Sequence, residues 1–301
     1  MIETFDVALP HGITLSCRAA GAKGAPRVLF LHGFPEAAFA WDGLLERLSG
    51  AVRGVAPNLR GFERSTAPRE VEAYRPRHLV ADIEALIARL GGSVDLLVAH
   101  DWGGAVAWNL AAQKPGLMRR LLILNSPHPA TFLRELRDNP LQQQASAYMN
   151  FLCRADAQAL LAADDYARLW PFFERMGGRA WLDEPMRDRY RAVWSMGLEG
   201  GLNYYRATPL RPPGTADGEG ADALAALQMP DEAVTIQVPT TVVWGEQDHA
   251  LLPGLLNGLS RWVPHLRLVR VPDASHWIVH EQPELVAREI LASLASIDAG
   301  G

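Results

Sequence analysis

The chain has few cysteines, no excess of basic residues and no long apolar run, and each absence excludes a class of protein. Only two of its 301 residues are cysteines, and the spacing of Cys17 and Cys153 fits neither a disulfide framework nor a zinc motif. The net charge of −5 offers no basic face for nucleic acid. No stretch approaches the roughly 18 apolar residues of a membrane span, and no signal peptide is evident. We therefore expect a cytoplasmic protein that binds neither nucleic acid nor membranes, and no metal or organic cofactor is implied.

Strand and helix signals alternate along most of the chain. Residues 4–9 and 14–18, joined by Pro10-His11-Gly12, predict a hairpin. Further strands are expected at 27–31, 52–57, 96–99, 121–124, 240–244 and 266–271, and helices at 41–48, 78–90, 105–112 and 283–294. This alternation predicts an α/β fold with a mostly parallel sheet that is covered by helices on both faces.

The alternation stops in the middle of the chain. From residue 128 to 210 strand signals are lacking, while aromatic residues and helix formers are dense. A segment rich in glycine and proline, residues 211–220, then predicts a loop. We therefore expect an all-helical cap at 128–228, inserted between two parts of one core at 1–127 and 229–301.

One short segment carries the strongest chemical signal. In His100-Asp101-Trp102-Gly103-Gly104, Asp101 falls on the turn between a buried strand and a helix, the context of a nucleophile elbow. The small residues around it permit a sharp turn and close packing of the helix on the strand. An aspartate nucleophile forms an alkyl ester, which predicts displacement at a saturated carbon, as in opening an epoxide or expelling a halide. The plainer alternative is that Asp101 only caps the helix.

Hydrolysis of such an ester needs a water activated by a general base. His276 and Asp248 each follow a predicted strand, and the order nucleophile, acid, histidine is that of an α/β-hydrolase. Because parallel strands end at one edge of a sheet, the three side chains should converge there. Glu246 is a rival for the acid, whereas the neutral Asn125 removes another competitor.

Six other histidines have no place in this scheme. We interpret them as packing or surface residues, with His100 also placed to brace the elbow; they are His32, His100, His128, His249, His265 and His280.

Five segments together resemble a known family. They are Leu31-His32-Gly33-Phe34-Pro35-Glu36, Pro57-Asn58-Leu59-Arg60-Gly61-Phe62, His100-Asp101-Trp102-Gly103-Gly104, Trp244-Gly245-Glu246-Gln247-Asp248 and Ser275-His276-Trp277. In these segments the chain resembles α/β-hydrolase-fold epoxide hydrolases, a branch shared with haloalkane and haloacetate dehalogenases. The resemblance covers nearly the whole chain.

This resemblance implies further site residues. Epoxide hydrolases carry two cap tyrosines that protonate the epoxide oxygen, and Tyr148 and Tyr205 fit these positions, with Tyr204 as a competitor for the second. The amides of Phe34 and Trp102 would form the oxyanion hole, and the side chains of Phe34, Trp102 and Tyr204 would contact substrate. The implied substrate is a small apolar epoxide, converted to a vicinal diol.

Two other functions are compatible with an aspartate at the elbow. Trp102 follows Asp101 as in haloalkane dehalogenases, yet Phe34 stands where such enzymes commonly have an asparagine donor. Against a haloacetate dehalogenase, Trp102 and Ala105 stand where arginines are expected, although Arg206 or Arg134 could substitute from the cap. A non-catalytic ligand-binding relative is disfavoured because the triad residues are complete.

Overall fold

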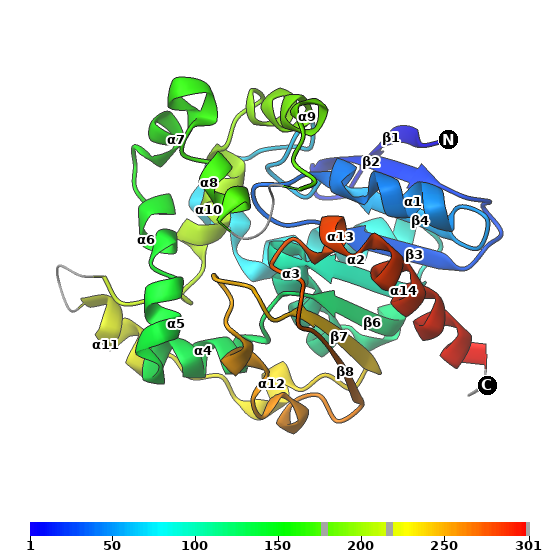
Figure 1. Ribbon diagram of the computed structural model, residues 1–301. Helices are drawn as coiled ribbons and strands as arrows, with labels where there is room; N and C mark the ends of the chain where they lie inside the picture. Colours follow the sequence, from blue (N-terminus) through cyan, green and yellow to red (C-terminus); the bar gives the residue numbers. More distant parts are fainter. Residues whose placement is uncertain (176–179, 215–218, 299–301) are drawn as a thin grey trace.

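The protein is built on one eight-stranded sheet with the strand order β1-β2-β4-β3-β5-β6-β7-β8 (Figure 1). The computed structural model describes residues 1–175, 180–214 and 219–298. The strands are β1 (Glu3–Ala8), β2 (Thr14–Ala20), β3 (Arg27–Leu31), β4 (Arg53–Pro57), β5 (Val94–His100), β6 (Met118–Leu124), β7 (Thr240–Gly245) and β8 (Leu266–Val271). The hairpin β1–β2 and the pair β2–β4 are antiparallel, and the other neighbours are parallel. The predicted fold class is confirmed.

The register of the central strands brings their ends together. Leu31 of β3 pairs with Ala99 of β5, and Ala99 pairs in turn with Ile123 of β6. These residues are fully buried, as expected for parallel strands covered on both faces. The loops that follow β3, β5 and β6 therefore leave the sheet side by side, and this edge is where the predicted site residues lie.

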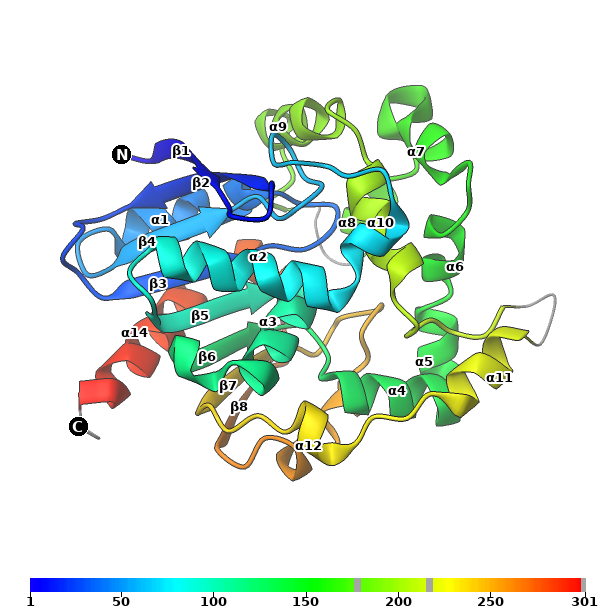
Figure 2. The same cartoon turned by 180° about the vertical axis from the view of Figure 1, so that it is seen from behind.

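Helices cover both faces of the sheet. Helices α2 (Pro76–Arg89) and α3 (Asp101–Gln113) pack on one face, and α1 (Asp42–Leu48) and α14 (Pro283–Asp298) on the other, as the two opposite views show (Figures 1 and 2). The apolar positions predicted for α2, among them Leu79, Ile83 and Leu86, are buried in the first of two separate hydrophobic cores. Each amphipathic helix thus buries its apolar face against the sheet.

Between β6 and β7 the described part of the chain contains helices and no strand. These are α4 (Pro129–Asp138), α5 (Pro140–Ala145), α6 (Tyr148–Leu152), α7 (Ala157–Tyr166), α8 (Trp170–Glu174), α9 (Glu184–Trp194), α10 (Glu199–Ala207), α11 (Glu219–Ala226) and α12 (Asp231–Val234). We call α4 to α11 the cap helices; they gather beside the sheet at the end where α3 begins (Figure 1). Helix α12 packs against α3 and so lies with the sheet. The loop predicted at 211–220 ends too late, because Glu219 already begins α11; residues 215–218 lie outside the described part.

The aromatic residues of the cap helices serve two purposes. Trp170, Phe173, Tyr190 and Trp194 are buried and pack on one another, with ring centroids 4.7 to 6.5 Å apart. They form a core of their own, which a layer of short helices needs for stability. A second group, described below, faces a cavity. In the described residues, no helix is both long enough and apolar enough to cross a membrane.

Candidate active site

Asp101 stands on a strained turn at the end of β5. Its φ angle is +48°, a left-handed conformation that is rare for a residue other than glycine and is found at functional sites. A Cβ on Gly103 would lie 2.4 Å from the carbonyl oxygen of Leu31, so only glycine permits this approach of α3 to β3. The N-cap position of α3 is His100, not Asp101. The interpretation of Asp101 as a simple helix cap is therefore wrong.

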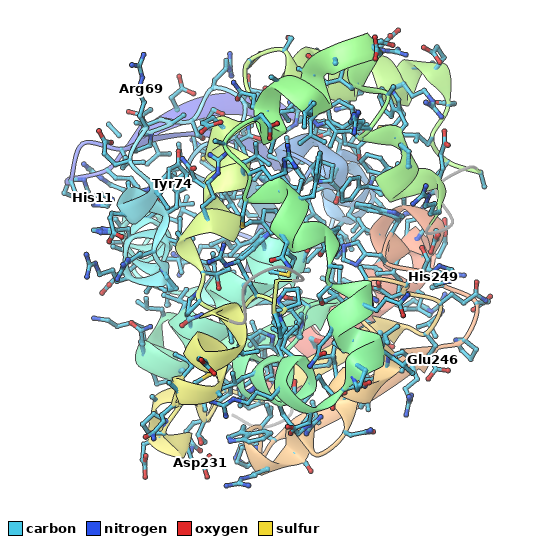
Figure 3. All side chains as sticks on the ribbon, turned by 90° about the vertical axis from the view of Figure 1, so that its left-hand side faces the viewer. His11, Arg69, Tyr74, Asp231, Glu246 and His249 are labelled. Carbon is cyan, nitrogen blue, oxygen red and sulfur yellow. The ribbon has the colours of Figure 1, made fainter. Side chains whose placement is uncertain are left out.

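The three predicted triad residues meet at the edge of the sheet. His276 follows β8, and its Nδ1 lies 2.7 Å from Oδ2 of Asp248, which follows β7. The other ring nitrogen, Nε2, lies 3.8 Å from Oδ2 of Asp101. The rival Glu246 pairs instead with Arg270 and lies at the periphery of the molecule (Figure 3). Asp248, and not Glu246, thus orients the imidazole.

Asp248 is held by several donors. Its Oδ1 accepts hydrogen bonds of 2.9 Å from the amides of Ala250 and Leu251, and its Oδ2 also accepts one of 2.9 Å from Nδ2 of Asn125. Burial by itself would raise the pKa of Asp248, but the neighbouring His276 and these hydrogen bonds keep it lowered. Sequence reasoning noted Asn125 only as a missing carboxylate. Asn125 follows β6, and Asp248 follows the neighbouring strand β7. This position at the end of β6 was the feature of the sequence that could have predicted the contact between the two residues.

His276 is basic for a buried imidazole. Burial lowers its pKa, but the charge of Asp248 and its hydrogen bond, together with the charge of Asp101, raise the pKa to about 9. The ring of the free protein is therefore protonated near neutral pH.

Phe34 contacts Asp101 from the loop after β3. Its backbone amide donates a 2.8 Å hydrogen bond to Oδ1 of Asp101. The peptide bond between Phe34 and Pro35 is cis. A Cβ on Gly33 would lie 2.1 Å from the same carboxylate oxygen, so this loop can approach the nucleophile only with glycine at that position. One of the two expected oxyanion donors is thus in contact with Asp101, while the role of the Trp102 amide stays a prediction.

Tyr148 of α6 and Tyr205 of α10 line one cavity together with Asp101. Their ring centroids are 6.2 Å apart, and the ring of Trp102 lies 5.0 Å from that of Tyr205. Burial, followed by nearby groups that include Asp101, raises the pKa of both tyrosines, so both hydroxyls remain protonated and able to donate. Tyr204 differs, because its hydroxyl donates to the carbonyl of Arg60 at 3.0 Å. Tyr204 therefore lines the cavity with its ring and not with its hydroxyl.

Glu36 forms a buried network beneath the triad that sequence reasoning did not assign. Its Oε1 accepts hydrogen bonds from Tyr190 of α9 at 2.7 Å and from Nε2 of His280 at 2.6 Å, and its Oε2 lies 3.4 Å from Nδ1 of His100. Nε2 of His100 lies 2.8 Å from the carbonyl oxygen of His276. Burial favours the neutral acid, but these partners hold the pKa of Glu36 well below its usual range. A glutamate between apolar residues in the segment after β3 was the signal available in the sequence.

The cavity in front of Asp101 measures about 170 Å³. An engineered protein cavity of about 150 Å³ holds a benzene molecule, so this one has room for a small organic substrate. Its lining is mostly apolar, and no lysine or arginine of the described residues contributes to it. Chemically, the site combines a carboxylate on a tight turn, a hydrogen-bonded histidine–aspartate pair and two protonated phenols around an apolar space. An arrangement of this kind is able to form an ester on the carboxylate and to hydrolyse it.

Comparison with known proteins agrees with this description. The family model for the alpha/beta hydrolase fold matches residues 26–283. The chain is 33% identical to the AB hydrolase superfamily protein YfhM of Bacillus subtilis, over 94% of this chain and 95% of the relative. It is 32% identical to epoxide hydrolase 3 of Xenopus tropicalis, over 93% of this chain and 74% of the relative.

Solved structures give the same result. The inhibitor complex of the Bacillus megaterium epoxide hydrolase superimposes with a TM-score of 0.88 at 30% identity, covering 97% of this chain and all of that one. An epoxide hydrolase from metagenomes of hot environments gives a TM-score of 0.87 at 34% identity, with 98% and 99% coverage. The chain belongs to the α/β-hydrolase fold family and, within it, to the group of the epoxide hydrolases. The resemblance inferred from the five sequence segments is confirmed.

Proposed function

We propose that this protein hydrolyses epoxides to vicinal diols through an ester on Asp101. The observation that carries the proposal is the placement of two protonated tyrosines, Tyr148 and Tyr205, across an apolar cavity from an aspartate that faces a histidine–aspartate pair. An epoxide needs a nucleophile at carbon and an acid at oxygen at the same time, and this cavity offers both. Its relatives named as epoxide hydrolases support the same activity.

In the first step, Asp101 attacks one epoxide carbon. The Phe34 amide holds Oδ1, which leaves Oδ2 as the attacking oxygen. As the new C–O bond forms, the C–O bond of the epoxide breaks, and the departing oxygen takes a proton from Tyr148 or Tyr205. Without that donor the product would be an alkoxide, so the tyrosines lower the barrier.

In the second step, water hydrolyses the ester. Neutral His276 removes a proton from water, and the resulting hydroxide adds to the ester carbonyl of Asp101. The carbonyl oxygen becomes an oxyanion, which the Phe34 amide and, by resemblance, the Trp102 amide stabilise. Collapse of the tetrahedral intermediate breaks the bond between the carbonyl carbon and the oxygen that attacked the epoxide, and this leaving oxygen takes the proton that His276 removed from water. The carboxylic acid left on Asp101 returns its proton to the deprotonated tyrosine. The diol therefore leaves with an oxygen that came from Asp101. The mechanism requires no metal or cofactor.

The alternative functions find less support. A haloacetate needs a cation for its carboxylate, and the two candidate arginines are engaged elsewhere: Arg206 with Glu199 and Asn203, Arg134 with Glu135 and the carbonyl of Asn257. A haloalkane needs N–H donors for the halide; Trp102 has an indole N–H, but Phe34 offers no side-chain donor beside it. A non-catalytic binding protein would have no use for the aligned triad.

The organisation of the chain completes the proposal. We assign residues 1–127 and 229–301 to the core and 128–228 to a helical cap that closes over the site, and we place the protein in the cytoplasm. Its partner is a small apolar epoxide.

The test is the intact mass of a His276→Ala variant after exposure to a terminal epoxide, a haloalkane and a haloacetate in separate reactions. Because ester formation survives while hydrolysis stalls, an adduct equal to the mass of the whole epoxide should accumulate. A His276→Ala, Asp101→Ala double variant is the matched control and should remain unmodified. An adduct that forms only from a halogenated compound would transfer the assignment to dehalogenation.

A further inference from the structure

The loop that carries Asp248 has little regular structure of its own. Residues 246–252, all of which the structure describes, lie between β7 and a 3₁₀ turn that begins at Pro253, and they belong to no helix or strand. Gln247 and His249, on either side of Asp248, are exposed, and His249 lies near the edge of the molecule in Figure 3. Surface loops are more mobile than the elements they connect, so hydrogen bonds from other segments must hold this one in place.

Two side-chain amides hold the two ends of the loop. At its start, Asn125 accepts a hydrogen bond of 2.8 Å from the amide of Gly245 and donates one of 3.2 Å to the carbonyl of the same residue. At its end, Nε2 of Gln142 donates to the carbonyl of Ala250 at 2.8 Å, and Oε1 of Gln142 accepts from the amide of Leu252 at 3.0 Å. Asn125 follows a strand of the sheet, whereas Gln142 belongs to the cap helix α5. The loop of the triad acid is therefore bound to both parts of the molecule.

Gln142 is fully buried, and each of its polar groups has a partner. None of its surface is exposed, and its second N–H donates to Oγ of Ser146 at 2.8 Å. Glutamine is mostly exposed in folded proteins, because burying an amide costs free energy unless its hydrogen bonds are made. A buried amide with all its partners in place fixes one arrangement of the groups around it.

The hydrogen bonds of Gln142 fix the groups that hold Asp248. The carbonyl of Ala250, which Gln142 binds, belongs to the same peptide group as the amide of Leu251. A peptide group is planar, so a hydrogen bond at its carbonyl also sets the direction of its N–H. That N–H donates to Oδ1 of Asp248 at 2.9 Å, beside the amide of Ala250. We infer, on the basis of the proposed function, that Gln142 is a positioning residue for ester hydrolysis, which keeps Asp248 in place against His276 by orienting the Leu251 amide.

This role affects one step of the proposed cycle. The pair of Asp248 and His276 activates the water that hydrolyses the ester, whereas ester formation needs the carboxylate of Asp101 and the tyrosine donors. Loss of the Gln142 contacts should therefore slow hydrolysis and leave ester formation in place. A merely structural role would differ, because a smaller folded fraction lowers the amplitude of both steps alike.

The experiment measures the two steps separately in the Gln142→Met variant, which keeps the length of the side chain but removes both contacts with the loop. Each protein is mixed with 1,2-epoxybutane in a single turnover and quenched at intervals; the intact mass gives the ester on Asp101, and diol release gives its hydrolysis. Hydrolysis should be slower by about ten-fold or more, since a small displacement of a catalytic group has effects of this order. Ester formation should stay within about two-fold, so the ester accumulates.

Two further variants are the controls. Gln143 is the neighbouring residue of the same type, and its Nε2 donates to the carbonyls of Leu136 and Arg137 inside the cap, at 2.8 and 3.1 Å. Gln143→Met should leave both rates unchanged. Ser146→Ala removes the contact of Gln142 within the cap but keeps its two contacts with the loop, and it should leave hydrolysis unchanged.

The outcomes separate this inference from the proposed function. Unchanged hydrolysis in Gln142→Met, an equal slowing of both steps, or the same slowing in Ser146→Ala overturns the inference while the proposed function stands. If Gln142→Met does not fold, Gln142→Asn gives the same comparison, because it retains a buried amide that is one methylene too short to reach both loop groups. If the unmodified protein forms neither ester nor diol, the proposed function fails and the inference with it.

Discussion

His276 must change its protonation state during the proposed cycle. In the free protein its pKa is about 9, partly because of the charge on Asp101, so the ring is protonated near neutral pH. Esterification removes that charge and should lower the pKa of His276, which makes the ring neutral when water has to be activated. Because only the neutral imidazole can accept a proton from water, a lower pH protonates His276 and slows hydrolysis of the ester.

We therefore predict that the rate of ester hydrolysis rises with pH and levels off, with an apparent pKa below about 9. The measurement is a single-turnover experiment that follows diol release at a series of pH values. Asp248→Asn, which removes the main cause of the raised pKa, should move the midpoint to lower pH while reducing the rate. A rate independent of pH across this range would contradict the role of His276 as the base.

Two adjacent tyrosines offer a second comparison at the scale of residues. Tyr205 lines the cavity together with Asp101, whereas the hydroxyl of Tyr204 donates a hydrogen bond to the carbonyl of Arg60. We predict that Tyr205→Phe lowers kcat for epoxides on the order of 100-fold, with Tyr148 left as the single donor. Tyr204→Phe should instead lower the free energy of unfolding by about 1 kcal/mol, with little change in kcat. Steady-state kinetics and denaturant unfolding of both variants test the pair, and equal losses of kcat would refute the distinction.

At the scale of elements, the position of Tyr205 depends on how closely α10 approaches the loop after β4. A Cβ on Gly200 of α10 would lie 2.3 Å from the carbonyl oxygen of Gly61, so the helix is seated directly on that backbone. Because a backbone atom cannot move aside as a flexible side chain can, a larger residue must displace the helix.

We predict that Gly200→Ala lowers kcat at least about ten-fold by shifting Tyr205 away from the epoxide oxygen. Gly214→Ala, also in the cap region, is the matched control, because a Cβ there meets nothing within 4 Å. Its kinetics should equal those of the unmodified protein. Activity retained in Gly200→Ala would show that the close contact of α10 with the backbone of Gly61 does not control the position of Tyr205.

At the scale of the whole molecule, Glu36 connects the cap helices to the sheet. It accepts a hydrogen bond from the hydroxyl of Tyr190 in α9, and it contacts His280 and His100 beside the triad. Its lowered pKa means that the folded state favours the charged carboxylate. The charged carboxylate therefore stabilises the folded state at pH values above 4.5, the ordinary pKa of a glutamate. This stabilisation is lost as the pH falls through the lowered pKa of Glu36.

We predict that Glu36→Gln lowers Tm near neutral pH and weakens the dependence of Tm on pH below about 4.5. Tyr190→Phe removes only the hydrogen bond from the cap, so it should cost about 1 kcal/mol and leave the pH dependence in place. Thermal unfolding followed across the acidic range measures both effects. Identical pH profiles for Glu36→Gln and the unmodified protein would rule out this charge as a stabilising link.

The sequence by itself determined the order of strands and helices and the elbow at Asp101. Hydrophobic periodicity reports which side of an element is buried, and that information is local. The convergence of Asp101, Asp248 and His276 was also predictable, because side chains that follow parallel strands meet at one edge of the sheet.

Contacts between distant segments were decided only by the tertiary structure. Neighbouring tyrosines on a helix point about 100° apart, and which hydroxyl is tied to a carbonyl depends on the loop that packs against α10, more than a hundred residues earlier in the chain. The tertiary structure likewise decided that Asp248 and not Glu246 contacts His276, which groups donate hydrogen bonds to Asp248, and which residues contact Glu36. Hydrogen bonds depend on positions within a few tenths of an ångström, and in a folded chain those positions are set by packing, which no local pattern encodes.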